Sequence, residues 1–166
     1  MRILVHQAIS KDISTVSDIL NEAAQWLEYQ GMPLWREDEV SLEGVRPDVE
    51  AGLFYLASCA DVPAGVIKFQ TEDPLFWPDV SDGDSAFIHR LAVRRIFAGG
   101  SVSTALLNWA VSHARRLGKH YLRLDCAADR PRLRFVYEKF GFLHHSDRQV
   151  GLFSVARYEY VLLADA

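Results

Sequence analysis

The chain has 166 residues, 49% of them hydrophobic and 24% charged, which fits one ordinary globular domain with a sizeable core. Its formal net charge of −4 argues against a general nucleic-acid-binding protein. No apolar run is long enough to cross a membrane, and the first residues lack the apolar region and cleavage site of a signal peptide. We therefore expect a single domain over residues 1–166 that is cytoplasmic, without a membrane or nucleic-acid partner. Cys59 and Cys126 are too few and too far apart for a disulfide scaffold or a zinc pattern, so we expect two core thiols and no metal.

In chain order, alternation of apolar residues predicts strands, and apolar residues at spacings of three and four predict helices. Glycine and proline mark the ends of the helices. The predicted elements of the first half are a strand over 1–8, a helix over about 11–29, a polar, broken helix over 37–52, and a hairpin of 53–59 and 64–70 joined by 60–63. The predicted elements of the second half are a loop over 71–85, a strand over 86–93, a helix over 102–117, a buried strand over 120–126, a helix over 131–140 and two strands over 141–150 and 153–163.

The alternation of strands and helices in the second half implies at least one parallel crossover within an otherwise antiparallel sheet. We therefore expect a mixed α/β fold with a mostly antiparallel sheet and flanking helices.

One segment of this pattern predicts an anion site. The segment FAGGSVSTALL, residues 97–107, leads from a strand through two glycines into a helix. The first amide N–H groups of a helix have no partner within the helix, and the helix dipole adds partial positive charge there. Gly99 and Gly100 allow close approach of a ligand, and Ser101 or Ser103 could cap the helix or bind a phosphate oxygen. An ordinary loop with a helix cap is the alternative interpretation of the same residues.

Two motifs at their observed separation resemble the GCN5-related N-acetyltransferase family, abbreviated GNAT. The strand, loop and helix of that family are similar to the segment IHRLAVRRIFAGGSVSTALLNWA. Its later tyrosine segment is similar to LRFVYEKFGF, which follows RLDC. The resemblance covers residues 86–142. It implies a fold of the acyl-CoA N-acyltransferase type, in which the parallel strand pair is splayed, and acetyl-CoA as co-substrate.

The loop departs from the family pattern at several positions. Ala98 stands where glutamine or arginine is usual, Ser101 where glycine is usual, and Ser103 where glycine or alanine is usual. Arg130 stands where asparagine is common. The backbone amides remain, since every residue except proline carries one. The cofactor-binding residues that the resemblance implies are Leu91, Ala92, Val93, Ala98, Gly99, Gly100, Ser101, Val102, Ser103, Thr104 and Arg130.

The resemblance also implies catalytic roles. Tyr137 matches the tyrosine that donates a proton to the leaving thiolate, and a buried core tyrosine is the alternative. His89 is the candidate general base, because imidazole accepts protons near neutral pH; a histidine that is only hydrogen-bonded in the sheet is the alternative. Other candidates for the base are Glu28, Glu72 and Asp73.

The acceptor site is expected to contain aromatic and acidic side chains, which suit a cationic amine. We select Trp35, Trp77 and Glu28 as substrate-binding residues. The acceptor is expected to be a small primary amine, an amino acid or a polyamine, and a protein lysine or N-terminus is the alternative. Two other functions fit the altered loop: an acyl-CoA-binding sensor or inactive relative, and an unrelated phosphate-binding domain. The apolar C-terminal strand could also pair across a homodimer at an open edge.

Overall fold

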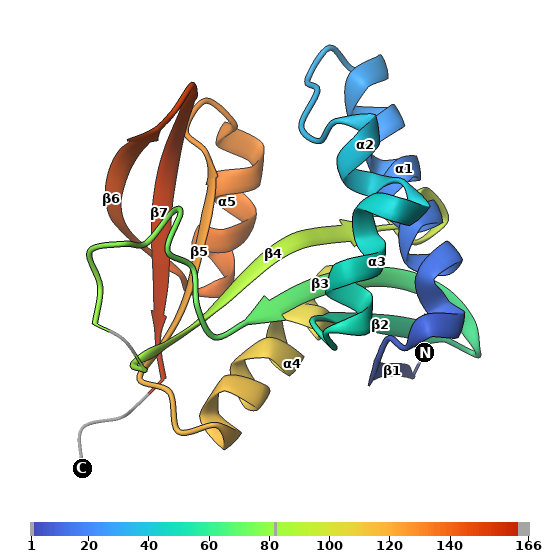
Figure 1. The fold of residues 1–166 in the computed structure, drawn as a ribbon, viewed down its shortest axis with the longest axis horizontal. Helices are drawn as coiled ribbons and strands as arrows, with labels where there is room; N and C mark the ends of the chain where they lie inside the picture. Colours follow the sequence, from blue (N-terminus) through green and yellow to red (C-terminus); the bar gives the residue numbers. More distant parts are fainter. Residues whose placement is uncertain (1, 82, 163–166) are drawn as a thin grey trace. The chain divides into compact units, whose positions relative to one another are not determined.

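The computed structural model describes residues 2–81 and 83–162 and shows a mixed α/β fold (Figure 1). A seven-stranded sheet has the order β1-β2-β3-β4-β5-β7-β6, and its β4–β5 pair is parallel. This confirms the predicted fold class. The strands are β1 (Ile3–Gln7), β2 (Phe54–Cys59), β3 (Val62–Gln70), β4 (Ser85–Val93), β5 (Tyr121–Ala127), β6 (Leu143–Val150) and β7 (Phe153–Val161). The helices are α1 (Ile13–Tyr29), α2 (Glu37–Val40), α3 (Leu42–Glu50), α4 (Val102–Arg116) and α5 (Pro131–Phe140), with short 3-10 turns η1 (Ser10–Asp12) and η2 (Arg95–Phe97). None of the helices in the described ranges is both long and apolar enough to span a membrane.

The chain divides into two compact units. Unit 1 comprises Met1–Phe69 and Arg90–Trp109, and unit 2 comprises Gln70–His89 and Ala110–Ala166. Because the division passes through β4 and α4, each unit is built from two separate segments of the chain. The single-domain expectation for residues 1–166 stays a prediction.

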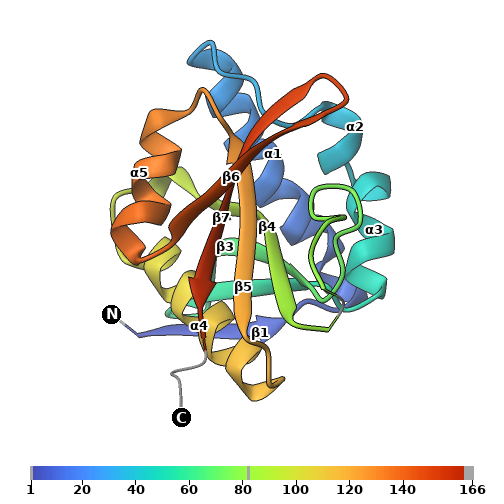
Figure 2. The same cartoon turned by 90° about the vertical axis from the view of Figure 1, so that its left-hand side faces the viewer.

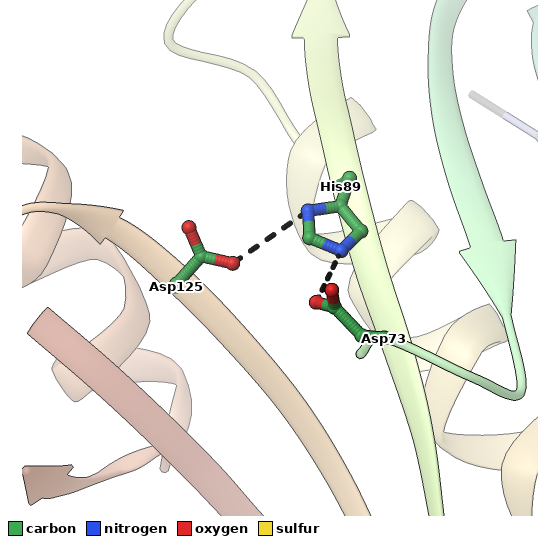
Figure 3. A group of neighbouring side chains, drawn as sticks. All are labelled: Asp73, His89 and Asp125. Carbon is green, nitrogen blue, oxygen red and sulfur yellow. Dashed lines mark hydrogen bonds and ion pairs between the residues drawn. The ribbon is translucent and has the colours of Figure 1, made fainter. Parts of the chain in front are cut away.

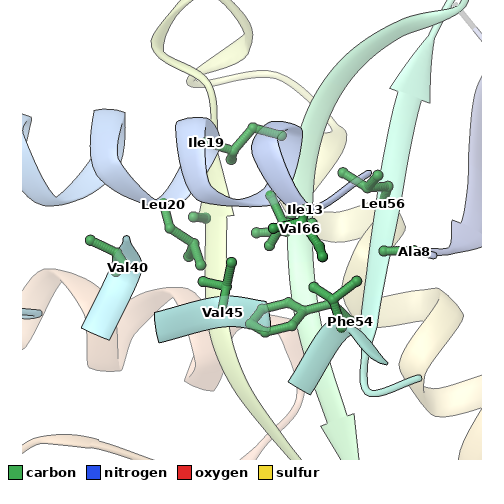
Figure 4. Packing of buried hydrophobic residues seen from close by; sticks show 12 residues of the cluster. Ala8, Ile13, Ile19, Leu20, Val40, Val45, Phe54, Leu56 and Val66 are labelled. Atoms are coloured by element: carbon green, nitrogen blue, oxygen red, sulfur yellow. The ribbon is translucent and has the colours of Figure 1, made fainter. Parts of the chain in front are cut away.

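The core of unit 1 lies between α1 and the first strands (Figure 4). Ile13, Ile19 and Leu20 form part of the apolar stripe of α1 and are almost completely buried. They belong to the same cluster as Phe54 of β2 and Val66 of β3. Burying a side chain of this size stabilises the fold by about 1.5–3 kcal/mol, so the helical spacing seen in the sequence is sufficient to place α1 on the sheet.

The predicted hairpin is present, but its turn is tighter than expected. Ala60 and Asp61 have φ angles of 48° and 65°, and β3 begins directly after them at Val62. Two left-handed residues make the kind of two-residue turn that matches strand twist. The chain lacks the Asn-Gly signal of such turns, which is why the sequence suggested a longer connection over 60–63.

Unit 2 contains the strands β5, β7 and β6 side by side (Figure 2). The β7 strand is paired with β5 on one side and with β6 on the other. The expectation that the C-terminal strand offers an open edge was therefore wrong, because its backbone groups are already used by two neighbours. The edge strand of this part of the sheet is β6.

The parallel ladder between β4 and β5 is short. It runs from Ser85↔Tyr121 to Phe87↔Arg123 and stops there. Two residues farther along each strand are His89 and Asp125. The backbone ladder does not continue to these two positions. Their polar side chains face each other between the two strands instead.

Candidate active site

The loop between β3 and β4 is held by a buried arginine of β7. The Arg157 guanidinium donates hydrogen bonds to Asp79 Oδ1 and Oδ2, at 2.7 and 3.1 Å, and to the Phe76 carbonyl oxygen at 3.1 Å. The hydrogen bonds from Arg157 to the Asp79 carboxylate lower the pKa of Asp79 to about 2. Trp77 is buried and lies under the Arg157 guanidinium, 4.5 Å from ring centroid to Cζ. We therefore propose that Trp77, which the sequence suggested for acceptor binding, anchors this loop.

The same loop presents Asp73 to His89 (Figure 3). Asp73 Oδ2 lies 2.9 Å from His89 Nε2, while Asp73 Oδ1 accepts a hydrogen bond from the Phe76 amide at 3.2 Å. A second hydrogen bond, from the Trp77 amide to the Asp73 carbonyl oxygen at 2.9 Å, closes a turn around the residue. Asp73 is thus fixed through its backbone and both carboxylate oxygens.

Asp125 of β5 approaches the other nitrogen of the same imidazole. Its Oδ1 lies 3.7 Å from His89 Nδ1, and its side chain is only 10% exposed. Within the described residues this Oδ1 has no hydrogen-bond partner. Burial raises the pKa of Asp125 to about 6; the negative charge of Asp73 also raises it, and the nearby His89 and Arg157 lower it. Sequence reasoning missed Asp125, although a carboxylate inside a strand that is otherwise buried was a usable signal.

Asp73, His89 and Asp125 are close enough in space to be considered as metal ligands. The two carboxylates, however, face opposite nitrogens of the imidazole (Figure 3). This is the arrangement of a hydrogen-bonded acid–base group, since ligands of one cation must converge on one point.

Tyr137 lies in the same unit, on α5. It is buried, with its ring edge-on to Phe142 at 5.9 Å between centroids. Burial raises the pKa of Tyr137, and the neighbouring Cys126 and Asp125 raise it further. Burial likewise raises the pKa of Cys126 to about 12. Both groups therefore stay protonated at neutral pH, and the phenol can act as a hydrogen-bond donor. Both cysteines are buried free thiols, as expected.

In unit 1, the start of α4 has the geometry expected for an anion site. The Ser101 carbonyl oxygen accepts the first helical hydrogen bond, from the Ala105 amide at 2.9 Å. The amides of Val102, Ser103 and Thr104 precede it and therefore have no partner within the helix.

The loop before this helix is open. Its residues Ala98, Gly99, Gly100 and Ser101 are exposed, and Gly99 has a φ of +78° that favours glycine. This loop therefore fits a phosphate group, because amides, an exposed hydroxyl and a flexible glycine meet there.

Gly65 of β3 allows α4 to lie close to the sheet of unit 1. A Cβ atom at this position would lie 2.9 Å from the Ala92 carbonyl oxygen and 3.1 Å from side-chain carbons of Val102 and Leu106. Gly65 was not among the residues selected from the sequence, although a glycine inside a strand often marks such a close approach.

Arg90, in the middle of β4, has a φ of 56°, which is unusual for a residue other than glycine and costs on the order of 1 kcal/mol. Its guanidinium lies 5.4 Å from the Trp35 ring centroid and 3.3 Å from Glu39 Oε2. Leu91, Ala92 and Val93 follow it to the end of the strand. A left-handed residue within a strand interrupts the regular ladder and redirects the next backbone groups.

Three further residues selected from the sequence are Glu28, Glu72 and Arg130. Glu28 is exposed near the end of α1, and Glu72 is exposed in the loop before β4. Arg130 is the residue before α5, with its Nε 3.8 Å from Asp129 Oδ1. Of the candidates for the base, the structure thus brings together His89 and Asp73, and it adds Asp125.

The mixed sheet with its parallel β4–β5 pair and the helix start after β4 have the architecture of N-acyltransferases. A structure of a GNAT-family acetyltransferase from Listeria monocytogenes 4b F2365 superposes with a TM-score of 0.79, at 23% identity, over 95% of each chain. The structure of yncA from Salmonella typhimurium with its cofactor acetyl-CoA has a TM-score of 0.73, at 17% identity, over 100% of this chain and 97% of the other.

Comparison of the sequence with known proteins identifies a relative and a family model that this chain matches. The uncharacterized N-acetyltransferase YesJ of Bacillus subtilis (strain 168) is 27% identical over 141 residues, which are 81% of this chain and 78% of YesJ. The model of the Acetyltransferase (GNAT) family matches residues 16–142. The chain belongs to the GNAT acetyltransferase family.

Proposed function

We propose that this protein is an acetyl-CoA-dependent N-acetyltransferase whose acceptor is the primary amine of a small molecule, an amino acid or a polyamine. Membership of the GNAT family supports the reaction type. The observation that carries the proposal is the half-buried His89 between two buried carboxylates, in the same unit as Tyr137. An imidazole in that environment is suited to take up a proton, and the phenol to donate a hydrogen bond.

Acetyl-CoA supplies an acetyl group activated as a thioester. We assign its diphosphate to the amides of residues 98–104, and the positive charge of Arg130 to a further contact with the cofactor. The backbone N–H groups of Leu91–Val93 are assigned to the carbonyl oxygen, where negative charge develops. The left-handed Arg90 directly before them supports this, because it interrupts the regular ladder of β4.

His89 accepts the proton that the amine must lose. An alkyl amine has an ordinary pKa of about 10.4, so it arrives as an ammonium that cannot attack a carbonyl carbon. Transfer of a proton to the imidazole frees the nitrogen lone pair, and the negative charges of Asp73 and Asp125 stabilise the imidazolium that results.

Tyr137 stabilises the leaving sulfur. Because its pKa is raised by burial, complete proton transfer to a thiolate with an ordinary pKa of about 8.5 is uphill. A hydrogen bond from the phenol to the sulfur is the step that this environment favours. The thiolate leaves as the free thiol by taking up the second proton, which the nitrogen releases as the amide forms.

Trp35 and Glu28 remain our proposed contacts for the acceptor. Trp35 is half-buried beside the Arg90 guanidinium, and Glu28 is an exposed carboxylate near the end of α1. An aromatic face and a negative charge suit a cationic amine.

Two experiments test the proposal. Isothermal titration with acetyl-CoA, and with ATP as control, should show saturable binding of acetyl-CoA alone. Release of free thiol is then measured with a panel of primary amines, amino acids and polyamines. His89→Gln should lower the rate by about 10²–10⁴-fold, the usual contribution of a general base, while His144→Gln, at a half-exposed histidine of unit 2, should not. Absence of acetyl-CoA binding would overturn the proposal. Binding without turnover of any amine would instead favour the acyl-CoA sensor.

A further inference from the structure

The environment of His89 distinguishes its two ring nitrogens. Nε2 lies at hydrogen-bonding distance from Asp73 Oδ2, at 2.9 Å, whereas Nδ1 lies 3.7 Å from Asp125 Oδ1, which is too long for a hydrogen bond. An ionised carboxylate can only accept hydrogen bonds, so the 2.9 Å contact requires a proton on Nε2.

We infer that Asp73 is a positioning residue that fixes His89 in its Nε2-protonated tautomer, so that Nδ1, on the side of Asp125, is the atom that accepts the catalytic proton. This inference rests on the proposed function for its catalytic part, while the tautomer itself can be observed without any reaction.

Asp73 can fix the ring because it is itself fixed. Its Oδ1 accepts a hydrogen bond from the Phe76 amide, and its side chain is only 5% exposed. Little conformational entropy is left to lose when Oδ2 binds Nε2–H. The carboxylate therefore orients the imidazole and selects the tautomer, as a buried aspartate does in a serine-protease triad.

Asp125 acts after the proton has arrived. Protonated Nδ1 carries an N–H that points to Asp125 Oδ1, an atom with no hydrogen-bond partner among the described residues. Shortening the 3.7 Å separation to about 2.8 Å gives a charge-assisted hydrogen bond. The imidazolium is then bound on both sides by carboxylates. Arg157 is the cation facing Asp125 from β7, and Tyr137 and Cys126 are the other titratable groups beside it.

The tautomer can be read directly by NMR of the protein labelled with ¹⁵N-histidine, without acetyl-CoA. Comparison with His89→Gln identifies the His89 signals among those of the six histidines. At a pH where His89 is neutral, we expect a protonated Nε2 and an unprotonated Nδ1. The opposite tautomer, or an equal mixture, would overturn the inference even if the protein proves to be an acetyltransferase.

Two substitutions separate the roles of the carboxylates. Asp73→Asn offers an amide N–H to Nε2 and should therefore move the proton to Nδ1. We expect kcat to fall by at least about 10²-fold and the acetyl-CoA affinity to stay unchanged, since a buried aspartate-to-asparagine change of this kind lowers kcat by about 10⁴-fold in a serine protease. Asp125→Asn should leave the tautomer unchanged and move the rising limb of the pH–rate profile to lower pH, because the imidazolium loses a negative partner.

Asp147→Asn is the matched control. It removes the carboxylate of an exposed Asp–His pair, in which His144 Nε2 lies 2.8 Å from Asp147 Oδ1, and should change neither the His89 NMR signals nor the pH–rate profile. A lower kcat in Asp73→Asn with the tautomer retained would show that Asp73 has only a structural role. If no amine is turned over by the unmodified protein, the proposed function fails, and the NMR result still decides the tautomer.

Discussion

Replacing Asp125 by asparagine is expected to make the protein more stable at neutral pH, at the expense of activity. Burial raises the pKa of this carboxyl from its ordinary 3.8 to about 6. Because the folded-state pKa lies above the unfolded one, the unfolded chain releases this proton first as the pH rises. The stability of the native protein therefore falls between about pH 4 and pH 6 and remains lower above that range.

The magnitude follows from the same values. The difference between about 6 and 3.8 corresponds to roughly 3 kcal/mol at 1.36 kcal/mol per pH unit. Asparagine keeps the size of the side chain and carries no charge, but it is still a buried polar group, so roughly 3 kcal/mol is the upper limit of the gain. At pH 4, where Asp125 is mostly protonated in the folded protein, the gain should nearly disappear.

Urea unfolding of both proteins at pH 4 and pH 8 measures this difference, with Glu72→Gln as an exposed-acid control that should show no such pH dependence. Equal destabilisation of Asp125→Asn at pH 4 and pH 8 would refute this prediction. That result would mean that the carboxylate is well accommodated when ionised and that its burial imposes no cost on the fold.

Three further predictions concern α4, Tyr137 and the loop before α4. Gly65→Ala places a Cβ atom 2.9 Å from the Ala92 carbonyl oxygen. We therefore expect the free energy of unfolding, measured by heat or urea, to fall by about 1–3 kcal/mol and acetyl-CoA binding to weaken. Unchanged values would show that α4 has room to move. Tyr137→Phe should lower kcat while titration shows the same acetyl-CoA affinity, and an unaffected kcat would remove the phenol from the mechanism. Gly99→Val combined with Gly100→Val should weaken acetyl-CoA binding in titration, because residue 99 is left-handed and branched side chains crowd the amides; an equal dissociation constant would leave the loop with a structural role only.

The order of helices and strands was predictable because it depends on local periodicity. The stripe of α1 and the proline and glycine that bound α5 are visible within a few residues of sequence. The hairpin turn at Ala60 and Asp61 was less predictable, because alanine is not a usual residue in the left-handed conformation and the pair contains no glycine.

The candidate site was predictable only in part, because it depends on strand register. His89 was found through the family resemblance, and Asp73 only as one of several alternative bases. Asp125 becomes significant through the Phe87↔Arg123 pairing, which brings two positions 36 residues apart to the same level of the sheet. Nothing in the local sequence specifies that register. The anchoring role that we propose for Trp77 also depends on a distant contact, since the Arg157 guanidinium beside its ring lies on β7.

Residues 73–79, in the loop between β3 and β4, both anchor that loop to β7 and hold the carboxylate that contacts His89. A carboxylate can select one histidine tautomer only if the free energy needed to displace the carboxylate exceeds the free-energy difference between the two tautomers. Arg157 holds Asp79 and the Phe76 carbonyl oxygen, and the Phe76 amide in turn holds Asp73. Loss of the guanidinium would leave Asp73 on a loop that is no longer tied to β7. The buried Arg157 is therefore expected to be required for the orientation of His89 although it touches neither ring nitrogen.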